Sequence, residues 1–130
     1  MKSLICLALL AVAVSALTEE QMKKAEGYAN ECLEKFPELN KDSLSKIRSG
    51  QFADANQDVK CFAKCFLERA GFMDAKGAFL TDYAIERLSL DHEKSKVEAL
   101  VQQCSKAYED PCETAFRAFE CYHNGKQQLI

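Results

Sequence analysis

Residues 56–71, NQDVKCFAKCFLERAG, decide the class of fold. Asn56 is a typical N-cap residue, and Gly71 is a typical residue to follow the last turn of a helix. The apolar residues between them recur at helical spacing, as Val59, Phe62, Phe66 and Ala70. The stretch therefore predicts an amphipathic helix that buries one face against the rest of the protein.

Two cysteines lie on this predicted helix. Cys61 and Cys65 are four residues apart, so both side chains project from one flank of the helix. Because this geometry does not let them bond each other comfortably, each must reach a different element. The helix is therefore expected to be cross-linked to other parts of the chain.

The same helical period recurs along most of the remaining chain and predicts five further helices. They are expected between Thr18 and Pro37, at 42–49, around 79–89, after Asp91, and from Asp110-Pro111 to Asn124-Gly125. No segment shows the alternation that is typical of a strand. The expected fold is all-α, a compact bundle of about six short helices.

The first sixteen residues differ from the rest of the chain. Lys2 is followed by an almost entirely apolar segment at 3–14, and Val14-Ser15-Ala16 fits the small-residue pattern of a cleavage site. This combination is typical of a secretory signal peptide, which is too short to span a membrane. We therefore expect a signal peptide at 1–16, one helical domain at 17–130, and a secreted, extracellular protein.

Composition excludes several classes of protein. Losing Lys2 with the signal peptide changes the formal net charge from −3 to −4, which disfavours nucleic-acid binding through phosphate contacts. The apolar content of 48% is too high for a disordered chain. No later apolar run is long enough for a transmembrane helix, so stable membrane insertion is not expected.

Cysteine is the most informative residue type. Seven occur in the chain, and Cys6 leaves with the expected signal peptide. The other six are Cys32, Cys61, Cys65, Cys104, Cys112 and Cys121, an even number that indicates three disulfides in a small exported chain. A metal site is the alternative, but no Cys-x2-Cys pair is present, so neither a metal nor another cofactor is expected. Spacing alone allows about 15 pairings, and helix geometry argues only against Cys61–Cys65.

The cysteine spacing, Cys-x28-Cys-x3-Cys-x38-Cys-x7-Cys-x8-Cys, resembles that of the insect odorant-binding proteins of the pheromone and general odorant-binding family. The resemblance covers the whole mature chain, 130 − 16 = 114 residues, and the x3 and x8 gaps are its most specific part. The x7 gap lies at or just below the short end for the family. The resemblance implies three disulfides, namely Cys32–Cys65, Cys61–Cys112 and Cys104–Cys121.

The resemblance also implies an apolar cavity between the helices and a carrier that binds small hydrophobic ligands reversibly. Odorants, pheromones and fatty acids are the implied ligands, and a chemosensory receptor is a further candidate partner. Apolar stripes and aromatic residues supply the expected lining, which is Phe62, Phe66, Phe72, Phe79, Leu80, Tyr83, Leu88, Leu100, Phe116, Phe119 and Tyr122. Any one of these residues is more typical of ordinary core, so the expectation applies to the set.

A ligand with a polar end needs a polar partner inside the apolar site, and three residues are candidates. Tyr122 lies on the apolar stripe of the last helix, so its hydroxyl is able to point inward. Arg117 falls on the polar side of that helix, where a surface role is favoured. His123 lies near the helix C-terminus, where a partly exposed histidine is the simpler interpretation. With only His92 and His123 in the chain, we expect at most a modest pH dependence of binding.

The chain ends in two apolar residues, Leu129 and Ile130, which is unusual for a frayed terminus. One hypothesis is that the tail folds back as a lid over the cavity mouth. A disordered tail is the alternative.

No catalytic set emerges, so the protein is not expected to be an enzyme. The adjacent residues Asp91-His92-Glu93 are common at a helix start, and no Gly-x-Ser-x-Gly motif is present. The second functional hypothesis is a secreted, disulfide-rich helical protein that binds a protein receptor or partner, which an exposed apolar patch would support. A carrier is expected to be a monomer or weak dimer and to retain lipid through gentle purification.

Overall fold

The computed structural model describes residues 19–53 and 55–129 of the chain. The expected signal peptide and Thr18 lie outside the described residues. The elements are α2 (Glu19–Lys35), α3 (Lys41–Arg48), α4 (Gln57–Ala70), α5 (Thr81–Leu88), α6 (Lys94–Cys104), α7 (Pro111–Gly125) and the 3₁₀ helix η1 (Lys126–Leu129). Between residues 19 and 129 the described chain has no strand, only an isolated bridge between Met73 and Phe79. The all-α fold class is confirmed.

Local sequence signals explain where several helices begin and end. Asn56 caps α4, because its side chain accepts a hydrogen bond of 3.0 Å from the Val59 backbone N–H. Asp110 caps α7 in the same way through the Cys112 N–H, at 2.9 Å. Gly71 follows α4 in the left-handed conformation, with φ +90°, which glycine adopts without steric cost.

Asp91, after which a helix is expected, is a typical capping residue but does not cap α6. The backbone N–H of Asp91 donates to the Leu88 carbonyl at 3.3 Å, so Asp91 belongs to the turn that follows α5. The helix begins at Lys94, with Glu93 in the cap position but without a side-chain capping bond.

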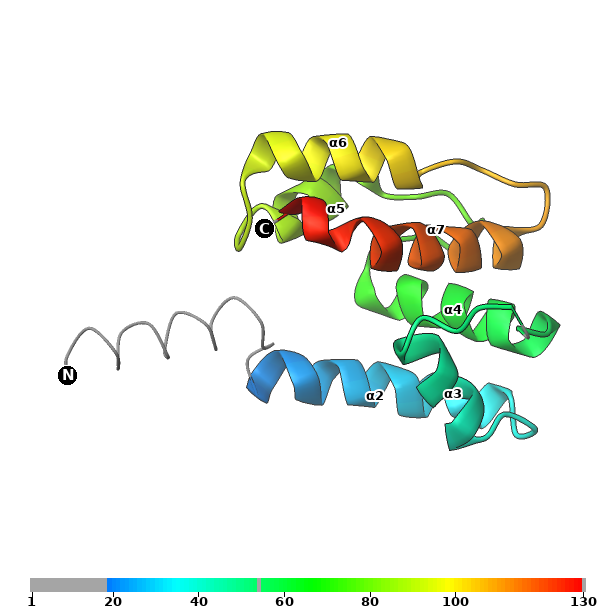
Figure 1. The fold of residues 1–130 in the computed structure, drawn as a ribbon. Helices are drawn as coiled ribbons and strands as arrows, with labels where there is room; N and C mark the ends of the chain where they lie inside the picture. The colour runs from blue at the N-terminus through cyan, green and yellow to red at the C-terminus, as the bar shows by residue number, and fades with distance from the viewer. Residues whose placement is uncertain (1–18, 54, 130) are drawn as a thin grey trace.

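The helices stack so that α4 lies between α2 and α7, while α6 lies on the other side of α7 (Figure 1). Helix α5 packs beside α6. The short helix α3 crosses near α2 and α4 in the same view. The central position of α4 fits its two cysteines, which face different neighbours.

Three disulfides join these helices in one series. Cys32 of α2 bonds Cys65 of α4, Cys61 of α4 bonds Cys112 of α7, and Cys104 of α6 bonds Cys121 of α7. These are the pairs that the family resemblance implies. The order of covalent links is therefore α2–α4–α7–α6, which is also the order of the stack.

The end of the chain packs against α6. Leu129 is only 5% exposed and forms a buried cluster with Val97, Leu100 and Val101. A disordered tail is therefore wrong for residues 126–129, because burying Leu129 gives the tail a hydrophobic reason to dock. Ile130, the other half of the lid hypothesis, lies outside the described residues.

Candidate ligand-binding cavity

A cavity of about 370 Å³ lies among α4, α5, α6, α7 and the loop before α5. Ligand sites in proteins are commonly about 300–1,000 Å³. Its lining is almost entirely apolar and comprises Phe66, Leu67, Phe72, Phe79, Thr81, Ala84, Leu88, Leu100, Val101, Cys104, Ser105, Ala118, Phe119 and Tyr122. We refer to this space as the large cavity.

The polar groups of the large cavity are three hydroxyls. Thr81 lies at the start of α5, Ser105 follows the last turn of α6, and Tyr122 lies in the last turn of α7. The Ser105 hydroxyl already donates to the Val101 carbonyl of its own helix. None of the lining residues of this cavity carries a charge. The site therefore offers hydrogen bonds to a ligand but no ion pair.

The phenol of Tyr122 differs from the other two hydroxyls of the large cavity because it is carried by an aromatic ring. Tyr122 remains 37% exposed, and partial burial raises the pKa of its phenol above the ordinary value of 10.0. The phenol is thus protonated at neutral pH. In that state it can donate a hydrogen bond to a carbonyl, or accept one from a hydroxyl.

The structure divides the expected lining residues into three groups. Seven line the large cavity, namely Phe66, Phe72, Phe79, Leu88, Leu100, Phe119 and Tyr122. Phe62 and Phe116 line a separate, smaller space. Leu80 and Tyr83 do not line the large cavity and are 41% and 39% exposed. Leu80 is the residue just before α5, and the Tyr83 ring packs on Phe72 with centroids 5.6 Å apart.

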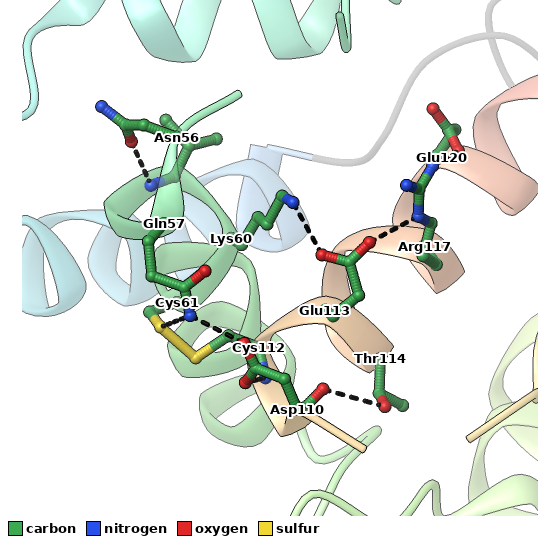
Figure 2. A network of polar contacts seen from close by, with 11 residues as sticks. Asn56, Gln57, Lys60, Cys61, Asp110, Cys112, Glu113, Thr114, Arg117 and Glu120 are labelled. Carbon is green, nitrogen blue, oxygen red and sulfur yellow. Dashed lines mark hydrogen bonds and ion pairs between the residues drawn. A yellow bond between two sulfur atoms is a disulfide. The ribbon is translucent and has the colours of Figure 1, made fainter. Parts of the chain in front are cut away.

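Arg117, an anchor candidate from the sequence, is not among the residues that line the large cavity. Its guanidinium donates to Glu113 at 2.7 Å and to Glu120 at 3.1 Å, both on its own helix (Figure 2). These partners raise the pKa of Arg117, the Glu113 hydrogen bond most. A charged group that is satisfied on the outer face of α7 gains nothing by moving into an apolar site.

His123 does not line the large cavity either. Its ring packs edge-on against Phe52, with centroids 5.5 Å apart. A side chain added at Gly50 would lie 2.7 Å from His123 Nε2, which places the ring against the segment that links α3 to α4. Tyr122 is thus the one anchor candidate from the sequence that borders the large cavity.

A polar network fastens the first turns of α4 and α7 beside the Cys61–Cys112 disulfide (Figure 2). Gln57 donates to Asp110 at 2.8 Å, and Lys60 pairs with Glu113 at 2.7 Å. The Gln57 hydrogen bond is the main cause that lowers the pKa of Asp110, and the Lys60 hydrogen bond is the main cause for Glu113. Both carboxylates are therefore ionised at neutral pH. Their contacts with Gln57 and Lys60 join the first turns of two helices that run parallel to each other.

Several lining residues were missed by sequence reasoning because they are small or lie at helix ends. Ala84 and Ala118 carry too little apolar surface to attract notice, although small side chains are what leave space beside a helix. Thr81 and Ser105 read as ordinary residues of helix ends. The sequence signal for these four residues was that each lies a few positions from an apolar stripe. That signal is weak.

Comparison with known proteins decides the family. The sequence profile of the PBP/GOBP family, the pheromone-binding and general odorant-binding proteins, matches residues 14–125. The chain belongs to the PBP/GOBP family. No helix in the described part of the chain is long and apolar enough to cross a membrane.

Two curated insect proteins illustrate the relationship. Odorant-binding protein 10 of Aedes aegypti is 28% identical over 111 residues, which are 85% of this chain and 79% of the relative. General odorant-binding protein 56a of Drosophila melanogaster is 26% identical over 111 residues, 85% of this chain and 78% of the relative. The PBP/GOBP family is one of small-ligand carriers, and the protein is not an enzyme.

Two solved structures share the fold. The fatty acid binding protein OBP56a from the oral disk of the blowfly Phormia regina is 31% identical and superposes with a TM-score of 0.72. The match covers 88% of this chain and 98% of the blowfly chain. The odorant-binding protein dmelOBP28a of Drosophila melanogaster, at 20% identity, has a TM-score of 0.70 over 86% of this chain and 98% of its own. The latter likeness concerns the fold alone.

Proposed function

We propose that this PBP/GOBP protein is a secreted carrier of long-chain ligands with one polar end, which occupy the large cavity. The observation that carries the proposal is an apolar cavity of about 370 Å³ whose polar groups are hydroxyls. Fatty acids are included among the ligands because the blowfly relative, at 31% identity, is described as a fatty acid binding protein. Cleavage after Ala16 would release the helical domain at 17–130 to the extracellular space.

Simple energetics support such a carrier. Each buried methylene contributes about 0.8 kcal/mol, so chains of about ten to sixteen carbons gain roughly 8–13 kcal/mol before costs. Loss of translational freedom and ordering of side chains remove several kcal/mol of that gain. Hydrogen bonds from the hydroxyls and contacts with the aromatic walls offset part of this loss of binding free energy. We expect dissociation constants in the micromolar range, which correspond to about −8 kcal/mol.

Because the residues that line the large cavity are uncharged, we do not expect a strong preference for a carboxylic acid over its ester. A carboxylate would find no cation among the residues that line the large cavity, so its charge must remain near water. A methyl ester keeps a carbonyl that can accept a hydrogen bond from Tyr122. We therefore expect hexadecanoic acid and its methyl ester to bind with affinities within about tenfold of each other.

Displacement of a hydrophobic fluorescent probe from the oxidised mature protein tests the proposal. Hexadecanoic acid, its methyl ester and a short terpenoid alcohol are compared as competitors. Displacement by both sixteen-carbon ligands supports the proposal. Displacement by the acid alone would show a cationic anchor and overturn the assignment of hydroxyl anchors. Failure of the probe to bind would overturn the carrier itself and favour a protein partner as the ligand.

A further inference from the structure

A second, smaller cavity of about 90 Å³ also borders the α4–α7 contact. It is bounded by α2, α3, α4 and α7, and every residue that lines it is apolar. The lining residues are Ala29, Leu44, Ile47, Val59, Phe62, Ala63, Phe66, Phe116 and Phe119. We refer to this space as the small cavity.

Phe66 of α4 and Phe119 of α7 line both cavities. The polar pairs Gln57–Asp110 and Lys60–Glu113 show that residues 53 apart in sequence lie at one level of these parallel helices (Figure 2). Phe66 and Phe119 are also 119 − 66 = 53 residues apart. The two rings therefore lie at the same level of the α4–α7 contact.

On α4 and α7 the other lining residues of the two cavities lie mostly on opposite sides of this level, with Ala118 as the exception, since it precedes Phe119 but lines the large cavity. Val59 and Phe62, which precede Phe66 on α4, line the small cavity, whereas Leu67 lines the large one. On α7, Phe116 lines the small cavity and Tyr122 lines the large one. Phe66 and Phe119 thus form the wall between the two spaces.

We propose that the small cavity is a second compartment for the apolar end of a long ligand, entered between Phe66 and Phe119. The inference rests on the carrier function proposed above and specifies how the protein would distinguish ligands by the length of their chains. The small cavity has about a quarter of the volume of the large one, so it would add room for only a few methylene groups. A sixteen-carbon chain would therefore use this extra room, whereas a ten-carbon chain would depend on it far less.

The side chains around the wall are suited to a rearrangement. Neither Phe66 nor Phe119 is fully buried. Phe66 makes one edge-on ring contact with Tyr28 of α2, at 6.2 Å between centroids. Rotation of either ring exchanges one apolar contact for another, because apolar residues line both sides.

Filling each cavity separately tests the proposal. Ala63 lines only the small cavity and Ala118 lines only the large one, so Ala63→Leu and Ala118→Leu form a matched pair. Affinities for 1-decanol and 1-hexadecanol are measured by probe displacement on the same sample of each variant. The ratio of the two affinities does not depend on the fraction of active protein.

We expect Ala63→Leu to weaken hexadecanol binding about 10-fold to 60-fold and to change decanol binding less than about twofold, because each excluded methylene costs about fourfold in affinity. Ala118→Leu should weaken both ligands. Ala29→Leu, which fills the small cavity from α2, should repeat the Ala63→Leu result if that variant fails to fold.

An unchanged hexadecanol-to-decanol ratio in both Ala63→Leu and Ala29→Leu would overturn the second compartment and leave the carrier function intact. Failure of both alcohols to bind the unaltered protein would instead overturn the carrier function on which the inference rests. The two failures are therefore distinguishable.

Discussion

Two glycines show how conformation at one residue affects stability in opposite directions. Gly71 ends α4 with φ +90°, and a side chain there would lie 3.1 Å from the Tyr83 ring. Gly27 lies inside α2 with nothing within 4 Å of an added side chain. The first position requires glycine, and the second does not.

Replacing each glycine by alanine tests this difference. Gly71→Ala should lower the free energy of unfolding by about 1–2 kcal/mol, because an L-residue is strained in the left-handed region. Gly27→Ala should raise it by about 0.5–1 kcal/mol, because glycine inside a helix loses more chain entropy than alanine does. Chemical denaturation of the two oxidised variants measures both values. Equal effects of one sign would contradict the account of the α4 terminus.

Tyr122 is the residue that should distinguish ligands by their polar end. Tyr122→Phe removes the hydroxyl and keeps the ring in the wall of the large cavity. We expect methyl hexadecanoate to lose about 0.5–1.5 kcal/mol of binding free energy, while hexadecane is unaffected because it has no hydrogen-bonding group. Competition against the fluorescent probe measures both ligands. Equal losses for ester and alkane would show that the variant perturbs packing rather than a hydrogen bond.

The sequence predicts which residues are apolar and inward-facing more reliably than which space they face. Phe62 and Phe116 belong to predicted helical stripes, and the structure places both at the small cavity. Helical period gives the direction of a side chain relative to its own axis. Which of two neighbouring cavities it meets depends on the packing of α4 against α7, which no local pattern contains.

At the scale of helices, a capping residue marked the true start of α4 and α7 but not that of α6. Asn56 and Asp110 cap α4 and α7 through hydrogen bonds to nearby N–H groups, so their signatures lie within a few residues. Asp91 has the same residue type but is used in the turn after α5. The tail could not be predicted either, because docking of Leu129 depends on the surface of α6.

The contact between α4 and α7 should weaken in acid. Lys60 and Arg117 lower the pKa of Glu113 in the folded protein relative to its ordinary value of 4.5. A lowered carboxyl pKa adds stability that is complete above the unfolded pKa and is lost as pH falls through the folded pKa. The free energy of unfolding should therefore change little from this source above pH ~5.5 and decline below pH ~4.5.

Glu113→Gln tests the origin of that decline. Because this ion pair is partly exposed, the variant should be less stable by only about 0.5–1 kcal/mol at pH 7, and the difference should narrow by pH 3. Unfolding is followed in denaturant at each pH. Glu20→Gln is the matched control, since Glu20 is 83% exposed and lies 3.7 Å from Lys24 on α2. A difference for Glu113→Gln that stays constant across pH would contradict the electrostatic origin.

At the scale of the whole molecule, three disulfides link the helices in series around cavities that the side chains do not fill. The disulfides connect α2, α4, α7 and α6 in the order in which these helices stack. A cavity removes packing contacts and so costs stability, whereas cross-links restrict the unfolded chain and offset part of that cost. A small helical domain is thus able to keep room for a ligand.

The most direct test of the account locates a bound ligand in solution. We would measure nuclear Overhauser effects between hexadecanoic acid and the labelled methyl groups of leucine and valine in the oxidised protein. The account predicts contacts to Leu88, Leu100 and Val101, which line the large cavity. Contacts confined to exposed residues such as Leu80 and Leu90 would contradict it, because they would place the ligand on the surface of the bundle.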